Sequence, residues 1–267
     1  MLAPNASPLT GGGTNTYVVG ARPPFTVVDP GPADDAHLAA ILAVAPDVGS
    51  IVVTHTHGDH SPGAAGLAAA TGAPVAGFGP MVRRGVEAHD DTFRADRTLV
   101  DGDVVAGADH QLVALHTPGH ASNHLCFLLD SGGQRVLFTG DHVMEGSTVV
   151  IAPLDGDMAA YLAQLERIRA LGVDLLLPGH GEPIFDPASY LQGYLDHRAA
   201  RTAKILAALA AAGPAGATCA ELVEVAYTDV PVTLHPVALY STWATLRATP
   251  EARTETPDTP EARWHHA

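Results

Sequence analysis

The sequence predicts an α/β protein, and three observations support this fold class. An apolar, β-branched run at 50–53 indicates a buried strand, and an alanine-rich run at 64–70 favours a helix directly after the loop 54–60. Later apolar runs of strand length also end at histidine or aspartate residues. The chain has 267 residues, of which 46% are hydrophobic, so it can bury a large core.

Local patterns predict the elements on either side of this loop. We expect two strands at 15–19 and 25–29, joined by a turn, and then a helix that opens at Asp34. The run at 74–76 predicts a short strand. The charged segment at 79–97 is expected at the surface, near the mouth of the site.

The second half of the chain repeats the pattern of a strand followed by a polar loop. An amphipathic helix is expected at 161–171. Further strands are expected at 112–115, 125–129, 136–138 and 175–177. Predicted strand ends then carry histidine or aspartate at 54–60, 117–120, 140–141 and 179–180. Because α/β sheets bind ligands at the carboxyl ends of their strands, we expect these loops to form one site.

The character of the sequence changes near residue 188. A long helix is expected at 188–212, and two shorter helices follow it. The pattern of helices and turns over 188–249 suggests a small helical, winged-helix-like appendage. We therefore expect a catalytic domain at 1–187, this appendage, and a Pro/Thr/Glu-rich, disordered tail at 250–267.

The loop at 54–60 concentrates side chains that can bind metal ions. His55, His57, Asp59 and His60 lie within six positions. Neutral imidazole suits zinc and iron, and a carboxylate adds an oxygen ligand. His55 and His57 are two residues apart and point the same way on an extended segment, whereas Asp59 and His60 follow as the chain turns. The loop can therefore contribute ligands to two ions.

Composition restricts the class of partner. Lys and Arg number 14 against 29 Asp and Glu, a net charge of −15 that disfavours a large anionic partner such as duplex DNA. The two cysteines do not suggest a disulfide framework. No apolar run is long enough to span a membrane and no signal peptide is evident, so we expect a cytoplasmic protein without a membrane partner.

The chain resembles the metallo-β-lactamase-fold hydrolases, and within them it looks most like the β-lactamase-like protein 2 group. The resemblance covers about residues 5–250. Its motifs are Gly-Thr-Asn-Thr-Tyr at 13–17, His-x-His-x-Asp-His at 55–60, Thr-Pro-Gly-His at 117–120 with His124 four residues on, Gly-Asp at 140–141, and Pro-Gly-His-Gly at 178–181. The sequence leaves open whether His124 lines the cleft or is a buried structural residue.

The resemblance implies a four-layer αββα sandwich with two metal ions in a cleft at the edges of the sheets. The implied metals are two zinc ions, with iron or manganese as alternatives. The ligands implied for the first ion are His55, His57 and His120. Those implied for the second ion are Asp59, His60 and His180, and Asp141 is expected to bridge the two ions.

The expected activity is hydrolysis of a small ester, thioester or lactam-like substrate by a hydroxide that bridges the two metals. Asp59 is the expected catalytic residue, which orients the proton of the nucleophile. Alternatives are an endoribonuclease for single-stranded RNA, a mono-iron persulfide dioxygenase and a non-catalytic binding module. Nucleic acid is disfavoured as a partner, although RNA stays open, and a homodimer is left open.

Overall fold

The computed structural model describes residues 1–79 and 89–267, so the first half of the charged segment expected at 79–97 lies mostly outside the described residues. Two five-stranded sheets make up the body of the protein. The first sheet has the order β1 (Tyr17–Val19), β2 (Phe25–Val28), β3 (Val48–Val52), β4 (Val75–Gly77) and β5 (Arg97–Thr98). The second has the order β10 (Leu175–Pro178), β9 (Gln134–Gly140), β8 (Leu125–Ser131), β7 (Gln111–His116) and β6 (Val104–Ala106).

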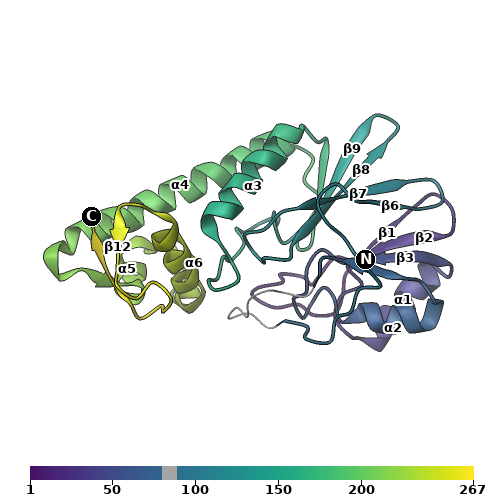
Figure 1. Cartoon of the computed structure of the whole chain (residues 1–267), viewed down its shortest axis with the longest axis horizontal. Helices are drawn as coiled ribbons and strands as arrows, with labels where there is room; N and C mark the ends of the chain where they lie inside the picture. The colour runs from purple at the N-terminus through teal and green to yellow at the C-terminus, as the bar shows by residue number, and fades with distance from the viewer. Residues whose placement is uncertain (80–88) are drawn as a thin grey trace.

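Helices cover the outer faces of the two sheets, as Figure 1 shows. Helices α1 (Asp35–Val44) and α2 (Gly63–Thr71) pack on the first sheet, and α3 (Met158–Leu171) and α4 (Pro187–Ala211) pack on the second. Apolar residues from both sheets, including Val52 and Phe127, form a core between them. The predicted αββα sandwich is therefore confirmed.

Strand direction brings particular chain segments to the same edge of each sheet. Strands β2 and β3 are parallel neighbours, and so are β9 and β10. Because parallel strands end at the same edge, the loops that follow each pair lie next to each other. The two edges are also joined, since the Leu125 amide donates a hydrogen bond to the Thr54 carbonyl at 2.7 Å. This edge positions the histidine-rich loops.

The predicted elements agree with the observed ones to within a few residues. The longest predicted helix, at 188–212, is α4, and Asp186 accepts a hydrogen bond from the Ser189 amide at its start. Asp34 and Asp157 cap α1 and α3 in the same way. These short acidic side chains satisfy amide groups that have no partner within the first helical turn.

The C-terminal part contains more structure than the sequence predicts. It comprises α5 (Cys219–Ala226), α6 (His235–Ala248), the 3₁₀ turns η1 (Gly213–Ala215) and η2 (Val232–Leu234), and strands β11 (Ala217–Thr218), β12 (Ala252–Arg253) and β13 (Arg263–His266). The strands form an antiparallel sheet of order β11-β13-β12. The expectation of a disordered tail at 250–267 is wrong, because β13 completes this sheet and buries Trp264 against α5. The winged-helix assignment and the domain boundaries stay predictions.

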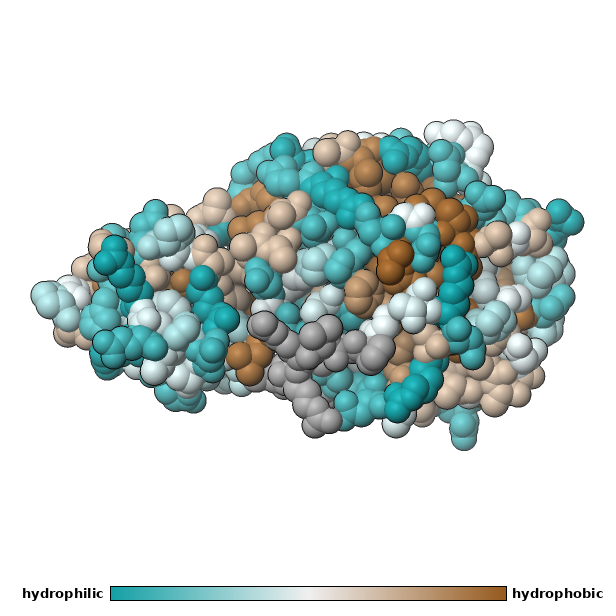
Figure 2. Space-filling view, viewed as in Figure 1, coloured by the Kyte–Doolittle hydropathy of each residue, from teal (hydrophilic) through white to brown (hydrophobic). Residues whose placement is uncertain are grey.

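The surface differs between the two parts of the molecule. On the face shown in Figure 2, hydrophobic residues gather over the sandwich, whereas the appendage, around the C-terminus in Figure 1, is mostly hydrophilic. Among the described residues, no helix is both long and apolar enough to cross a membrane.

The packing of β13 predicts that Trp264→Ala destabilises the appendage. Trp264 is 2% exposed and contacts the core that contains Cys219 and Leu222. Removing a buried tryptophan leaves a cavity and costs about 3–5 kcal/mol, so we expect a lower midpoint in urea unfolding followed by tryptophan fluorescence and circular dichroism. His266→Ala, at an exposed position of the same strand, is the control. Equal midpoints for the two variants would show that the tail does not pack as described.

Candidate metal centre

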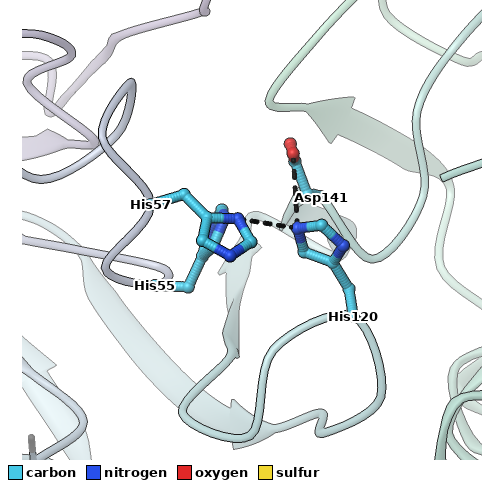
Figure 3. A group of neighbouring side chains, drawn as sticks. All are labelled: His55, His57, His120 and Asp141. Atoms are coloured by element: carbon cyan, nitrogen blue, oxygen red, sulfur yellow. Dashed lines mark hydrogen bonds and ion pairs between the residues drawn. The ribbon is translucent and has the colours of Figure 1, made fainter. Parts of the chain in front are cut away.

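Three imidazoles meet at the sheet edge. His55 and His57 come from the loop between β3 and α2, and His120 comes from the loop between β7 and β8. His57 Nδ1 lies 2.9 Å from His55 Nε2 and 2.9 Å from His120 Nε2. Figure 3 shows these rings facing one another, with Asp141 beside His120. Because one ring nitrogen can donate only one hydrogen, the convergence of these nitrogens suits a shared cation better than a set of hydrogen bonds.

A second group of side chains lies directly beside the first. His180 Nε2 is 3.2 Å from Asp59 Oδ2, and His60 Nε2 is 3.4 Å from the same oxygen. Asp141 lies between the groups, with Oδ1 3.3 Å from both His60 Nε2 and His180 Nε2, and Oδ2 3.7 Å from His120 Nε2. The structure thus brings all seven predicted ligands together, in the two sets that the resemblance implies.

Two buried atoms indicate whether metal ions fit this arrangement. Within the described residues, His60 Nε2 and Asp141 Oδ1 are buried and lack a hydrogen bond of good geometry, and their neighbours are each other, at 3.3 Å, and the other potential ligands. Such poorly satisfied buried polar atoms are costly, and a cation between them would remove the cost. Imidazole nitrogen with carboxylate oxygen is a donor set that zinc and iron accept. The residues present therefore fit a pair of metal ions.

The second nitrogen of most of these histidines is held by the protein. Such contacts fix the tautomer and the orientation of a ligand ring. The contacts are His55 Nδ1 with Thr54 Oγ1 at 3.0 Å, His60 Nδ1 with Asp29 Oδ2 at 2.8 Å, His120 Nδ1 with the Val150 carbonyl at 2.8 Å, and His180 Nδ1 with the Gly13 carbonyl at 3.1 Å. Each ring therefore presents its other nitrogen to the centre.

Asp29 is the residue of this site that sequence reasoning missed. Its carboxylate is 2% exposed and accepts hydrogen bonds at 2.7 Å from both the amide and the hydroxyl of Thr54. It also lies 2.8 Å from His60 Nδ1. The only signal in the sequence is Asp-Pro-Gly at a strand end, which resembles an ordinary turn. Pairing of β2 with β3 is what places Asp29 beside Thr54.

Glycine is required where the loops meet. The Gly179 amide donates to the Gly140 carbonyl at 2.9 Å, which joins the two loops that carry Asp141 and His180. A Cβ atom on Gly179 would lie 2.7 Å from Asp141 Oδ1 and 2.8 Å from His60 Cε1. Any other residue would therefore displace the ligands.

Burial and neighbouring charges shift the pKa values of the free ligands in opposite directions. Burial holds the pKa of His55 and of His57 well below the usual histidine value. Burial also opposes charge on His60 and His180, but the carboxylates of Asp59 and Asp141 outweigh it. The pKa of His60 is raised well above its usual value, and that of His180 is raised to about 10.

His124 is a buried supporting residue. It is fully buried, and its Nε2 accepts a hydrogen bond from the Asp141 amide at 3.2 Å. Its Nδ1 lies 2.8 Å from Thr117 Oγ1. The structural reading of this histidine is therefore the one that the contacts favour, since it holds the backbone of Asp141.

Metal binding is predicted to release protons. A histidine whose pKa is raised to about 10 carries a proton at pH 7.5, and a metal ion can bind only the neutral ring. Filling both groups at pH 7.5 should therefore release about two protons per chain, from His60 and His180. The measurement is isothermal titration calorimetry in buffers of different ionisation enthalpy.

Two variants test the assignment of these ligands. His180→Ala should bind one ion fewer and release about two protons fewer than the native chain, because His60 keeps its proton when the ion that it shares with His180 does not bind. Asp141→Ala should lose both ions together, as measured by elemental analysis after dialysis. A native chain that binds a single ion, or an Asp141→Ala variant that retains two, would contradict the shared site.

Comparisons with known proteins agree with this geometry. A family model described as the metallo-beta-lactamase superfamily matches residues 9–180. Lactamase-like protein vrtG of Penicillium aethiopicum is 31% identical over 240 residues, which cover 86% of this chain and 73% of that protein. An atrochrysone carboxyl ACP thioesterase of Aspergillus chevalieri is 31% identical over 237 residues, 85% of this chain and 72% of that protein. Some relatives are longer, and the chain spans 56% of lactamase-like protein nscB of Aspergillus fumigatus.

Solved structures show the same fold. The metallo-beta-lactamase family protein TTHA1429 of Thermus thermophilus is 22% identical, with a TM-score of 0.74 over 95% of this chain and 94% of that one. TTHA1623, solved in a di-iron-bound form, is 25% identical, with a TM-score of 0.55 over 69% of this chain and 94% of that one. The expected enzyme class, a metallo-hydrolase, agrees with these matches. Through the family match over 9–180 and relatives that are 31% identical over most of its length, the chain belongs to the metallo-beta-lactamase superfamily.

Proposed function

We propose that this chain is a hydrolase that uses two metal ions, zinc in the first instance, to cleave a thioester of a small-molecule substrate. The observation that carries the proposal is the position of Asp141 between the two groups of ligand atoms. Its two oxygens face different groups, with Oδ1 toward His60 and His180 and Oδ2 toward His120. One carboxylate placed in this way can hold two cations close together.

The chain's own residues have separable tasks in this reaction. When bound, a pair of metal ions lowers the pKa of a water molecule and polarises the substrate carbonyl. Asp59 is suited to hold the proton of that water, because its side chain is 26% exposed whereas that of Asp141 is 10% exposed. The Thr14 hydroxyl donates to Asp59 Oδ2 at 2.9 Å and so fixes the orientation of the carboxylate.

The choice of a thioester rests on similarity and charge. Relatives of about 30% identity include proteins named atrochrysone carboxyl ACP thioesterase. The net charge of −15 disfavours an extended anionic substrate, which counts against the RNA endoribonuclease alternative. A small thioester has no such electrostatic cost. We accordingly propose a small-molecule substrate rather than nucleic acid.

The ligand types alone do not select the metal, because imidazole and carboxylate suit zinc, iron and manganese. The di-iron-bound structure belongs to a protein whose match covers 69% of this chain. Elemental analysis of protein purified without added metal should find about two zinc ions per chain if the proposal holds. One iron per chain, with oxygen uptake on a persulfide, would instead support the dioxygenase alternative.

The proposal predicts that Asp59→Asn lowers kcat for thioester hydrolysis. The amide keeps an oxygen near His180 but cannot accept a proton, and removal of a general base typically costs about 10²–10⁴-fold in rate. The assay is release of free thiol, detected with a chromogenic disulfide, at saturating metal. Metal content is measured in parallel, so that loss of an ion is distinguished from loss of the base.

His265→Ala, at an exposed position on β13, is the control for this assay and should keep native activity. Single-stranded RNA is assayed with the same metal-loaded preparation. Cleavage of RNA without hydrolysis of any thioester would overturn the proposed substrate class. Native activity in Asp59→Asn would overturn the role given to this carboxylate.

A further inference from the structure

A cleft separates the sandwich from the appendage close to the metal centre. Its volume is about 430 Å³, which lies in the range of small-molecule sites. One wall is the loop at 153–157 with the start of α3, and the opposite wall is the last turns of α6. The residues used below are Ser122, Asp155, Gly156, Ala159, Ala244 and Ala248.

Direct contacts connect this cleft to the metal-binding loops. Ser122 lies two residues after His120, and its amide donates to Asp155 Oδ2 at 3.0 Å. His120 Nδ1 in turn lies 2.8 Å from the carbonyl of Val150, at the start of the segment that leads into the cleft wall. The loop that carries His120 therefore also supplies part of the cleft wall, through Ser122.

Two side chains that line the cleft have unused hydrogen-bonding capacity. Within the described residues, Asp155 Oδ1 and Ser122 Oγ are buried and make no hydrogen bond. Asp155 is 8% exposed, and a buried carboxylate oxygen without a donor is costly. The cost is removed by a ligand that brings N–H or O–H groups. The cleft is therefore suited to an occupant rich in hydrogen-bond donors.

The shape of the walls restricts the occupant further. Small residues face the cleft on both sides, Gly156 and Ala159 on the sandwich and Ala244 and Ala248 on α6. The larger side chains of Leu154, Met158 and Arg247 also line it. The small side chains between them leave room for a ligand that is a chain. Among the described residues that line the cleft, none is aromatic, so a ring system has no stacking surface there.

We propose that the cleft binds the thiol arm of the substrate, and that this arm is pantetheine. Pantetheine is a flexible chain with two amide N–H groups and two hydroxyl groups, its only branch is a pair of methyl groups, and it is uncharged without its phosphate. Asp155 would accept a hydrogen bond from an amide, and α6 would supply the opposite wall. The inference rests on the proposed thioester hydrolysis and deepens it, because it assigns the leaving-group side of the substrate to the appendage.

Binding of an uncleavable analogue tests the cleft separately from catalysis. The probe is S-ethyl pantetheine, a thioether without a scissile bond, titrated by calorimetry. Ala248→Phe places a large ring at an exposed position of the cleft wall, and it should weaken binding about tenfold or more. Asp155→Ala should weaken binding by a similar factor, because it removes a charge-assisted hydrogen bond. Ala211→Phe, at an exposed position near the end of α4, is the matched control and should bind like the native chain.

Hydrolysis assays complete the test. With the same acyl group on pantetheine and on ethanethiol, Ala248→Phe should lower the ratio of the two kcat/KM values about tenfold or more. Probe binding unaffected by Ala248→Phe, or an unchanged ratio, would overturn the cleft assignment. Probe binding that responds to Ala248→Phe without hydrolysis of any thioester would support the cleft ligand but overturn the proposed function.

Discussion

The metal centre depends on the hydrogen bonds that the Asp29 carboxylate accepts at the end of β2. This carboxylate holds His60 directly and holds His55 through Thr54, so it orients one ligand of each group. It is buried, and its charge is balanced by donors rather than by water. Asp29 also has a positive φ of 49°, a conformation uncommon outside glycine. The end of β2 and the backbone conformation of Asp29 therefore determine how two metal ligands are oriented.

Much of the fold could be predicted because strand and helix patterns here are local. The run 50–53 is apolar and β-branched, and Asp34 begins a helix in the expected way. The ligand positions could also be inferred, since short motifs such as His-x-His carry them at strand ends. In each case a few neighbouring residues determine the structure.

The features that sequence reasoning missed depend on contacts between distant segments. Asp29 acquires its role only when β2 pairs with β3, which places it beside Thr54. The tail at 250–267 has the composition of a disordered segment, but Trp264 packs into a core formed with α5 and β11. The composition of a segment describes only its average polarity. Burial of one large apolar side chain such as Trp264 against another part of the chain can still order the segment.

Helix α4 belongs to two hydrophobic cores at once. Leu191 and Tyr194 pack into the sandwich, and Ile205 and Leu209 pack into the appendage, on one unbroken run of 25 residues that leads from the sandwich into the appendage in Figure 1. Because the helix is continuous and packs in both cores, its direction sets the orientation of the appendage relative to the sandwich. Changes in the length or bend of α4 could therefore move the appendage during evolution without altering the metal ligands.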